Sequence, residues 1–317
     1  MPYPPAARLT RFDGPDPPPQ ECRHPRAGEE AATTDDEAAK NDDEASGVHS
    51  AFERTVEEGE DRLLKTWPGL FATGLVGGID VAFGVFAQVF VRYHTHNELL
   101  GAIAFTIGFF AVTLANSELF TESFLVPVAA VVAGKAGVRH LVRLWGCTLI
   151  FNLIGGWVLT GLTMAAFPKF REAAVEVARH YAEMGIGWSS LASALLGGTV
   201  LTLMTWMERS TPSVPAKLLA VFSVGFIVAG APLAHAVVSS LEAFSALHAG
   251  APFGYLDWLG AETWTVTWNL VGGLLLVTGL RLIQVGVGQV DEKRGDEGER
   301  SLKDAGAAEG ASTAPTV

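Results

Sequence analysis

The chain has 317 residues, of which 49% are hydrophobic, and a formal net charge of −12 at pH 7. Residues 1–65 hold 16 acidic and 8 basic residues, residues 291–317 hold 7 and 4, and the segment between them holds 11 and 10. An apolar, nearly neutral centre between two acidic ends is typical of a membrane domain with polar tails, and it excludes an ordinary soluble domain, whose charges are spread over its surface. The acidic tails also argue against a nucleic-acid partner.

The N-terminal segment 1–45 is rich in Pro, Ala, Asp and Glu and has no apolar periodicity, so we expect a disordered acidic tail. Residues 46–65 predict an amphipathic helix on the membrane surface, because their apolar side chains fall on one face; a solvated charged helix is the alternative. Residues 291–317 predict a second disordered tail, on the cytoplasmic side. Cys22 and Cys147 lie in a tail and in an apolar segment, which favours neither a disulfide nor a metal site.

Residues 66–290 contain the predicted channel domain, with six apolar segments long enough to cross a bilayer. The second and fifth segments are too long for simple spans, and each is interrupted, by "NSELFTES" (116–123) and by "GAPLAHAVVSS" (230–240). An irregular segment at membrane depth is tolerated only inside protein or beside a watery cavity, so the two breaks predict a transport pathway. The six segments cover residues 67–91, 99–134, 140–167, 187–207, 216–248 and 262–288.

An Asn-Leu-x-Gly-Gly sequence begins at Asn152 in the third segment and at Asn269 in the sixth, an offset of 117 residues. Three spans per half is an odd number, so the second half must cross the membrane in the opposite sense. The predicted fold is therefore an all-α membrane protein with six transmembrane helices in an inverted 3+3 repeat and with helices 2 and 5 broken. Close packing through Gly-Gly is an alternative reason for the glycines, although it does not explain the asparagines or the spacing.

Basic residues in the short loops predict the orientation. The loop between the second and third segments contains Lys135, Arg139 and Arg143, and the loop between the fourth and fifth contains Arg209 and Lys217. The opposite loops are mainly acidic. We therefore expect a multi-pass protein of the inner (plasma) membrane with both termini in the cytoplasm.

Four motifs, in this order and spacing, resemble the formate/nitrite transporter family: "ELFTESFLVPVAA", "FNLIGG", "FIVAGAPLAHAVV" and "WNLVGG". The resemblance spans residues 66–288 and lies close to the branch whose motif reads Glu-Leu-Phe-Thr-Glu. It implies an aquaporin-like protomer in a homo-pentamer, each protomer with its own pore and no cofactor. It also implies passive or proton-linked movement of small monovalent anions such as formate, nitrite or hydrosulfide across the lipid bilayer.

The resemblance assigns roles to individual residues. Thr121 matches the threonine of the loop that breaks the second helix, and His235 matches the pore histidine of the broken fifth helix. Asn269 matches a pore-lining asparagine, and Asn152 is its repeat mate. The resemblance places Phe105 and Phe226 at the outer constriction and Phe109, Leu119 and Phe120 at the inner one.

Two carboxylates, Glu118 and Glu122, lie inside the first break. Each could cap a half-helix by accepting hydrogen bonds from freed backbone N–H groups, whereas a carboxylate would repel a bound anion. Here the chain departs from the family pattern, in which a small neutral residue is usual at 122, a glutamate is often found at the position of Ala234, and a lysine is often found near 182–187. These departures concern the substrate more than the fold.

Two other function classes stay open. One is a membrane scaffold that has the channel fold without transport, and the other is a channel for a small neutral solute such as water or glycerol, although paired Asn-Pro-Ala loops are missing. An enzyme is not expected, because the sequence contains no nucleophile–base pair, metal cluster or nucleotide-binding loop.

Overall fold

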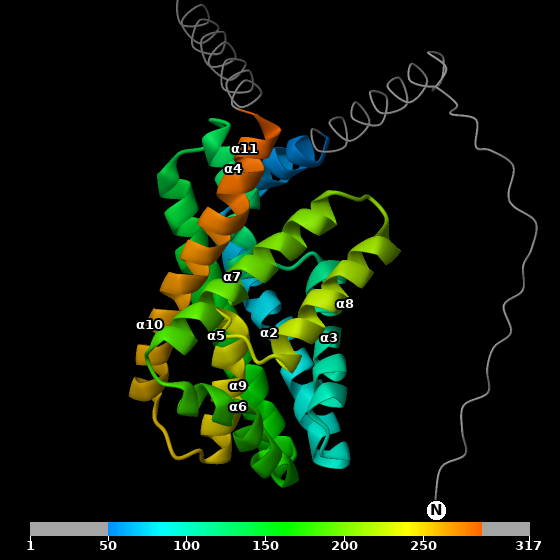
Figure 1. Ribbon diagram of the computed structural model, residues 1–317, viewed down its shortest axis with the longest axis vertical. Helices are drawn as coiled ribbons and strands as arrows, with labels where there is room; N and C mark the ends of the chain where they lie inside the picture. The colour runs from blue at the N-terminus through cyan, green and yellow to red at the C-terminus, as the bar shows by residue number, and fades with distance from the viewer. Residues whose placement is uncertain (1–49, 287–317) are drawn as a thin grey trace, which may run out of the picture. The chain divides into compact units, whose positions relative to one another are not determined.

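The computed structural model describes residues 50–286, except for the side chain at position 182, and the statements below concern that part of the chain. The two predicted tails, 1–45 and 291–317, lie outside the described residues. All regular structure in the described part is helical. In chain order the elements are a helix over residues 50–64, α2 (Trp67–Thr95), α3 (Glu98–Ala115), η1 (Phe120–Phe124), α4 (Val126–Val132), α5 (Val138–Ala166), η2 (Pro168–Phe170), α6 (Arg171–Met184), α7 (Trp188–Arg209), α8 (Val214–Gly230), α9 (Ala236–Ala249), α10 (Tyr255–Val271), η3 (Gly272–Gly279) and α11 (Leu280–Val285) (Figure 1).

Within residues 50–286, five helices are long and apolar enough to cross a membrane: α2, α3, α5, α7 and the continuous run α10–η3–α11. In each of these helices, at most half of an apolar stretch of 18 residues is buried inside the protein, and in α5 the buried share is only 28%. The remaining apolar side chains face outward, where lipid or a neighbouring protomer can cover them. The shorter apolar helices are α8, α9 and the segment 120–132.

Two helices stop in the positions that the sequence predicts. α3 ends at Asn116, which adopts a left-handed conformation with φ of 52°, and the chain then runs through η1 into α4. α8 ends at Gly230, and α9 begins at Ala236 after five intervening residues, the last of which is His235. Pro232 between them cannot donate a backbone hydrogen bond and disfavours helical geometry in the residue before it.

Glycines let two pairs of long helices cross at close range. A Cβ atom on Gly78 of α2 would strike the backbone of Asn152 on α5, and a Cβ atom on Gly198 of α7 would strike the backbone of Asn269 on α10. No larger side chain fits at either crossing without moving a helix. The crossings therefore fix the position of each asparagine along the axis of the helix that faces it.

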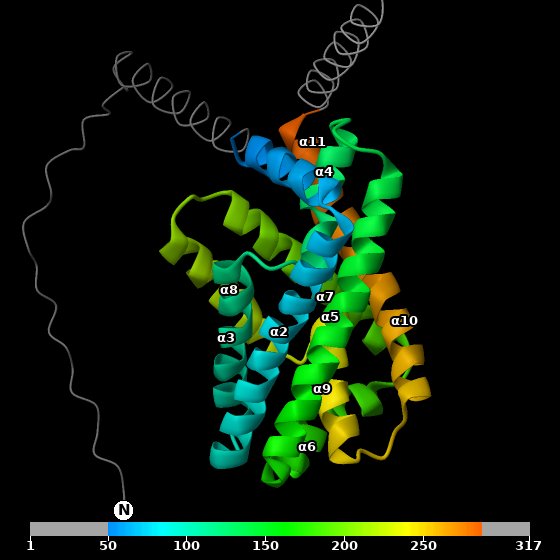
Figure 2. The same cartoon turned by 180° about the vertical axis from the view of Figure 1, so that it is seen from behind.

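The helix at 50–64 packs against the protein with its apolar face. Phe52 and Val56 are buried in a cluster that includes Leu125 and Ala129 of the α4 region and Trp206 of α7. Figure 2 shows this helix beside α4 and α11 at one end of the bundle. Its placement on the membrane surface stays a prediction.

The structure also contains helical segments that hydropathy did not anticipate. α6 spans Arg171–Met184 between the third and fourth predicted segments, where only a loop was expected. α10 begins at Tyr255, seven residues before the predicted start of the sixth segment. Both regions carry polar and charged residues, and a count of apolar residues alone passes over them.

Candidate functional site

The two helix interruptions meet at Thr121 and His235. The Nε2 atom of His235 lies 2.8 Å from the Oγ1 atom of Thr121, and both residues are fully buried. The backbone N–H of Val238 donates to the other ring nitrogen, Nδ1, at 3.1 Å, so His235 caps α9. Because Nδ1 accepts a hydrogen bond, the neutral tautomer that fits both contacts has its hydrogen on Nε2 and donates it to Thr121. This leaves the hydroxyl hydrogen of Thr121 without an acceptor among the described residues.

Asn152 holds the first interruption in place. Its Oδ1 atom accepts a hydrogen bond from the backbone N–H of Phe120 at 2.9 Å. Its Nδ2 atom donates to the carbonyl oxygens of Gly74, at 2.7 Å, and Glu118, at 2.9 Å. The side chain is fully buried, and both atoms of its amide bond to backbone groups: two in the break, of Glu118 and Phe120, and one in α2, of Gly74.

Asn269 does the same for the second interruption. Its Oδ1 atom accepts from the backbone N–H of Ala236 at 2.9 Å, and its Nδ2 atom donates to the carbonyl oxygens of Ala194, at 2.7 Å, and Ala234, at 2.9 Å. These bonds make Leu119 in the first break correspond to His235 in the second. In each break the asparagine bonds to the carbonyl of the residue before this position and to the N–H of the residue after it. In both breaks the asparagine amide is bonded to backbone, and the pore-lining role of the two residues stays a prediction.

Of the phenylalanines predicted for the constrictions, Phe109 lies next to His235. The rings of Phe105 and Phe109 are buried with centroids 5.2 Å apart, and the ring of Phe109 lies 6.5 Å from the imidazole of His235. Phe120 is also buried and meets Phe124 edge to face at 5.0 Å. Leu119 is fully buried in the same core. Phe226 is partly buried and stacks on Phe222, at 6.5 Å.

Glu118 is paired with a lysine from outside the break. Its carboxylate is 1% exposed, lies 2.7 Å from the Nζ atom of Lys65 and accepts a hydrogen bond from the Oγ1 atom of Thr73 at 3.2 Å. The structure records no side-chain cap for η1 or α4, and the freed N–H of Phe120 is bonded by Asn152 instead. Glu118 therefore connects the break to the start of α2 through side chains.

Glu122 reaches a second basic residue, Arg62. The Nη2 atom of Arg62 lies 3.5 Å from Glu122 and 2.7 Å from Glu58. Glu58 also pairs with Arg209 at the end of α7, at 2.6 Å. Burial disfavours the charged form of Arg62, but the carboxylates of Glu58, Glu122 and Glu118 outweigh this effect and raise the pKa of its guanidinium. The helix at 50–64 is thus bonded to the break and to α7 by paired charges.

Comparison of the sequence with models of protein families identifies the family of this chain. The model described as "Formate/nitrite transporter" matches residues 49–283. The chain belongs to this family. The prediction of a membrane channel or transporter rather than an enzyme is therefore confirmed, whereas the assignment to the Glu-Leu-Phe-Thr-Glu branch stays a prediction.

This formate/nitrite transporter family member is similar, at low sequence identity, to several curated proteins. It is 26% identical over 240 residues to the uncharacterized transporter YrhG of Bacillus subtilis, covering 71% of this chain and 88% of that protein. It is 22% identical over 222 residues to the formate channel BtFdhC of Bacillus thuringiensis, covering 65% and 82%. It is 27% identical over 140 residues to the formate channel FocA of Haemophilus influenzae, covering 42% and 48%.

Two solved structures share the fold. An "FNT family ion channel" superposes with a TM-score of 0.62 at 17% identity, covering 72% of this chain and 96% of that chain. A "Pentameric formate channel with formate bound" superposes with a TM-score of 0.55 at 19% identity, covering 68% and 95%. At these identities the likeness shows a shared helical channel fold.

Sequence reasoning named the two breaks and their two asparagines, but not the cations that pair with the carboxylates. The structure brings Thr121, His235 and Phe109 together, whereas Phe226 stacks on Phe222. The sequence analysis pairs neither Lys65 nor Arg62 with the carboxylates of the first break. Two unpaired carboxylates inside an apolar segment were the signal that such cations exist, because a buried charge needs a partner.

Proposed function

We propose that this chain is a channel or transporter for small monovalent anions of the formate, nitrite or hydrosulfide class, and that the ion passes between Thr121 and His235. The observation that supports this best is the 2.8 Å contact between the two side chains, one from each helix interruption. A buried pair of this kind at membrane depth needs a reason, since apolar residues would fill the same space at less cost. The family membership gives the class of function, and the named relatives include formate channels.

The geometry supplies hydrogen-bond donors for an anion. With Nε2–H directed at Thr121, the hydroxyl hydrogen of Thr121 is free to donate to an oxygen or sulfur of the passing ion. When the ion arrives, the Nε2–H of His235 can move from Thr121 to the ion. For the substrate to pass the apolar rings in neutral form, it must take a proton from the bulk water, because a neutral imidazole that gave up its Nε2–H would become an imidazolate. His235 can then hold the neutral acid by a hydrogen bond, which makes protons a second candidate partner.

The carboxylates of the break do not give it a net negative charge. Glu118 is paired with Lys65, and Glu122 with Arg62. The departure from the family pattern at position 122 is therefore balanced by a cation from the helix at 50–64, and an anion remains a fitting substrate.

The proposed architecture is an inverted 3+3 repeat of six spans with an aquaporin-like protomer, assembled as a homo-pentamer. The matching bonds of Asn152 and Asn269 support the repeat, with α8 and α9 together as the fifth span. A pentameric structural neighbour supports the assembly. The outward-facing apolar residues of α5 and α10–η3–α11 would contact lipid or neighbouring protomers. Native mass spectrometry in mild detergent should return five copies, and a stable dimer or trimer would contradict this assembly.

The proposed orientation places both termini in the cytoplasm. Four basic residues gather at the end of the bundle where the helix at 50–64 lies: Arg62, Lys65, Arg143 and Arg209. Arg143 joins this group because it donates a hydrogen bond to the carbonyl of Leu63 at 2.7 Å. Basic residues favour the cytoplasmic side. In this proposal the helix at 50–64 lies at the cytoplasmic surface, and the tails 1–45 and 291–317 take no part in the pore.

Solute flux into proteoliposomes tests the function. Vesicles are mixed with hyperosmotic solutions of formate, nitrite or hydrosulfide, all of the same osmolarity. After the initial shrinkage, vesicles with the protein should swell faster than empty vesicles. The swelling rates with these anions should change between two pH values. Glycerol should enter both kinds of vesicle at the same rate. Faster glycerol entry alone would favour the neutral-solute channel, and no effect on any solute would favour the scaffold.

A further inference from the structure

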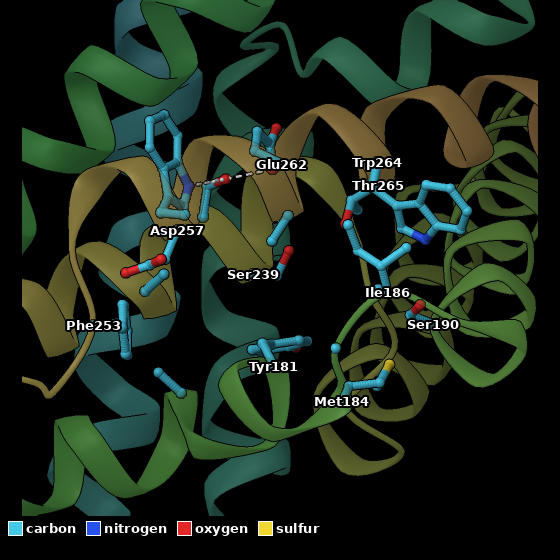
Figure 3. A pocket seen from close by; sticks show the side chains of 18 of the residues that line it. Tyr181, Met184, Ile186, Ser190, Ser239, Phe253, Asp257, Glu262, Trp264 and Thr265 are labelled. Carbon is cyan, nitrogen blue, oxygen red and sulfur yellow. Dashed lines mark hydrogen bonds between the residues drawn. The ribbon is translucent and has the colours of Figure 1, made fainter.

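A cavity of about 660 Å³ lies between α6, α7, α9 and α10, away from the proposed ion path (Figure 3). Its volume is typical of a small-molecule site. Thr121, His235 and the phenylalanines of the proposed constrictions do not line it. Ala234, the residue before His235, does line it, so the cavity reaches the second helix interruption from the side.

The cavity contains a buried carboxylate with a free oxygen. Glu262 of α10 is 6% exposed, and its Oε2 atom accepts a hydrogen bond from the Oγ atom of Ser240 at 2.7 Å, as Figure 3 shows. The hydroxyl of Ser240 in turn accepts from the Nε1 atom of Trp258 at 2.9 Å. The other carboxylate oxygen, Oε1, is buried with no hydrogen-bond partner. Among the described residues that line the cavity there is no Lys, Arg or His to pair with it.

A second polar group in the cavity wall also lacks a partner. Trp264 lies two residues after Glu262 on α10, and its Nε1–H is buried without an acceptor. Buried donors and acceptors normally find partners, because an unpaired one loses its hydrogen bonds to water. Residues two positions apart on a helix do not face each other, so Glu262 and Trp264 need separate partners, and the free Oε1 of Glu262 needs one that carries N–H groups.

The remaining wall favours a positive charge over a negative one. Tyr181, Phe253, Trp258 and Trp264 supply aromatic rings, which attract an ammonium group through their faces. The other carboxylate among the described residues of the wall is that of Asp257, which is exposed. An anion of the kind proposed for the pore therefore finds no cation here.

We propose that this cavity binds a primary ammonium group, as in ethanolamine and its phosphate ester. The ammonium donates to Oε1 of Glu262 among the aromatic side chains of the wall. This chemistry occurs in the headgroup of phosphatidylethanolamine and in free ethanolamine. The position favours the lipid, because α7 and α10 both begin at the cavity and its rim residues Ile186 and Leu256 are 70% and 84% exposed.

Native mass spectrometry of the purified protein tests the lipid source. The oligomer is titrated with phosphatidylethanolamine and with phosphatidylglycerol of the same acyl chains. We expect phosphatidylethanolamine to be retained preferentially and Glu262→Gln to weaken its binding by about tenfold, the loss expected for a charge-assisted hydrogen bond. The matched control is Glu172→Gln, which neutralises an exposed carboxylate of α6 outside the cavity.

Thermal unfolding with free ethanolamine tests the soluble source. A rise in Tm for the wild type that is lost in Glu262→Gln supports the same chemistry with a free amine as ligand. Glu262→Asp keeps the charge but shortens the side chain by one methylene, so it should weaken binding even if Glu262→Gln fails to assemble. Equal retention of both lipids together with no response to ethanolamine, or binding that neither variant changes, overturns the proposal. Flux is measured separately, so these outcomes leave the proposed function untouched.

Discussion

Asn152 and Asn269 stand 117 residues apart and make the same three hydrogen bonds, one accepted from a backbone N–H and two donated to backbone carbonyls. In each case one carbonyl belongs to a neighbouring long helix and the other to the interrupted segment. A single amide therefore replaces the bonds that a continuous helix would have made. The cost of breaking a helix at membrane depth is met in both halves by the same device.

Replacing either asparagine by alanine should destabilise the protein. Asn152→Ala leaves one buried N–H and two buried carbonyl oxygens short of a partner, and we expect a loss of about 2–4 kcal/mol in stability, with Asn269→Ala similar. Thermal unfolding of the purified oligomer measures this. Asn97→Ala is the matched control, since Asn97 caps the exposed start of α3 and should cost only about 1 kcal/mol. Equal losses at all three positions would contradict the structural importance of the two buried amides.

The hydroxyl of Thr121 should be needed for transport. Thr121→Val keeps the shape and removes the donor, so anion flux into proteoliposomes should fall about tenfold or more, while oligomer size stays unchanged. Thr121→Ser retains the hydroxyl and should keep most of the flux. If valine and serine gave the same rate, the 2.8 Å contact with His235 would be a packing contact only.

The glycine crossings should not accept a methyl group. Gly78→Ala and Gly198→Ala each place a Cβ atom against the backbone of the facing asparagine, and we expect a loss of about 1–3 kcal/mol or failure to assemble. Gly146→Ala on α5 meets nothing within 4 Å and should be neutral or slightly stabilising, because alanine favours a helix over glycine. Size-exclusion chromatography and thermal unfolding distinguish the three variants. Unchanged behaviour of Gly78→Ala would show that the helices can separate freely.

The ion pair between Lys65 and Glu118 should be strongly asymmetric. Lys65→Met leaves a buried carboxylate with Thr73 as its remaining side-chain donor and should cost about 1–3 kcal/mol, less than a fully buried pair because Lys65 is partly exposed. Adding Glu118→Gln to that variant should recover part of the loss. A double-mutant cycle read by thermal unfolding measures this coupling. Strictly additive effects would show that the two charges do not interact.

Removal of residues 1–45 should leave membrane insertion and flux intact. These residues lack the apolar surface needed for a core, and the contacts around the break come from the helix at 50–64 and from Lys65. Flux of the truncated and full-length proteins in matched vesicles is the measurement. A truncated protein that inserts and assembles but no longer transports would assign the tail a gating role.

The sequence by itself determined the membrane class, the family and the places where two helices break. Hydropathy marks the spans because lipid tolerates few charges, and "NSELFTES" stands out against its apolar neighbours for the same reason. The recurrence of Asn152 and Asn269 at a fixed offset pointed to two related halves. These signals are local, or repeat along the chain, and can be read without coordinates.

Only the tertiary structure decided which groups satisfy those breaks. Glu118 and Glu122 were expected to cap half-helices, yet the structure pairs them with Lys65 and Arg62, and it uses asparagine amides for the freed backbone. It also revealed the cavity beside Glu262, a residue to which the sequence analysis assigns no role. The physical reason is that hydrogen bonds and ion pairs join residues far apart in the chain, and a buried charge or amide shows its need for a partner in the sequence without showing which partner the fold brings within reach.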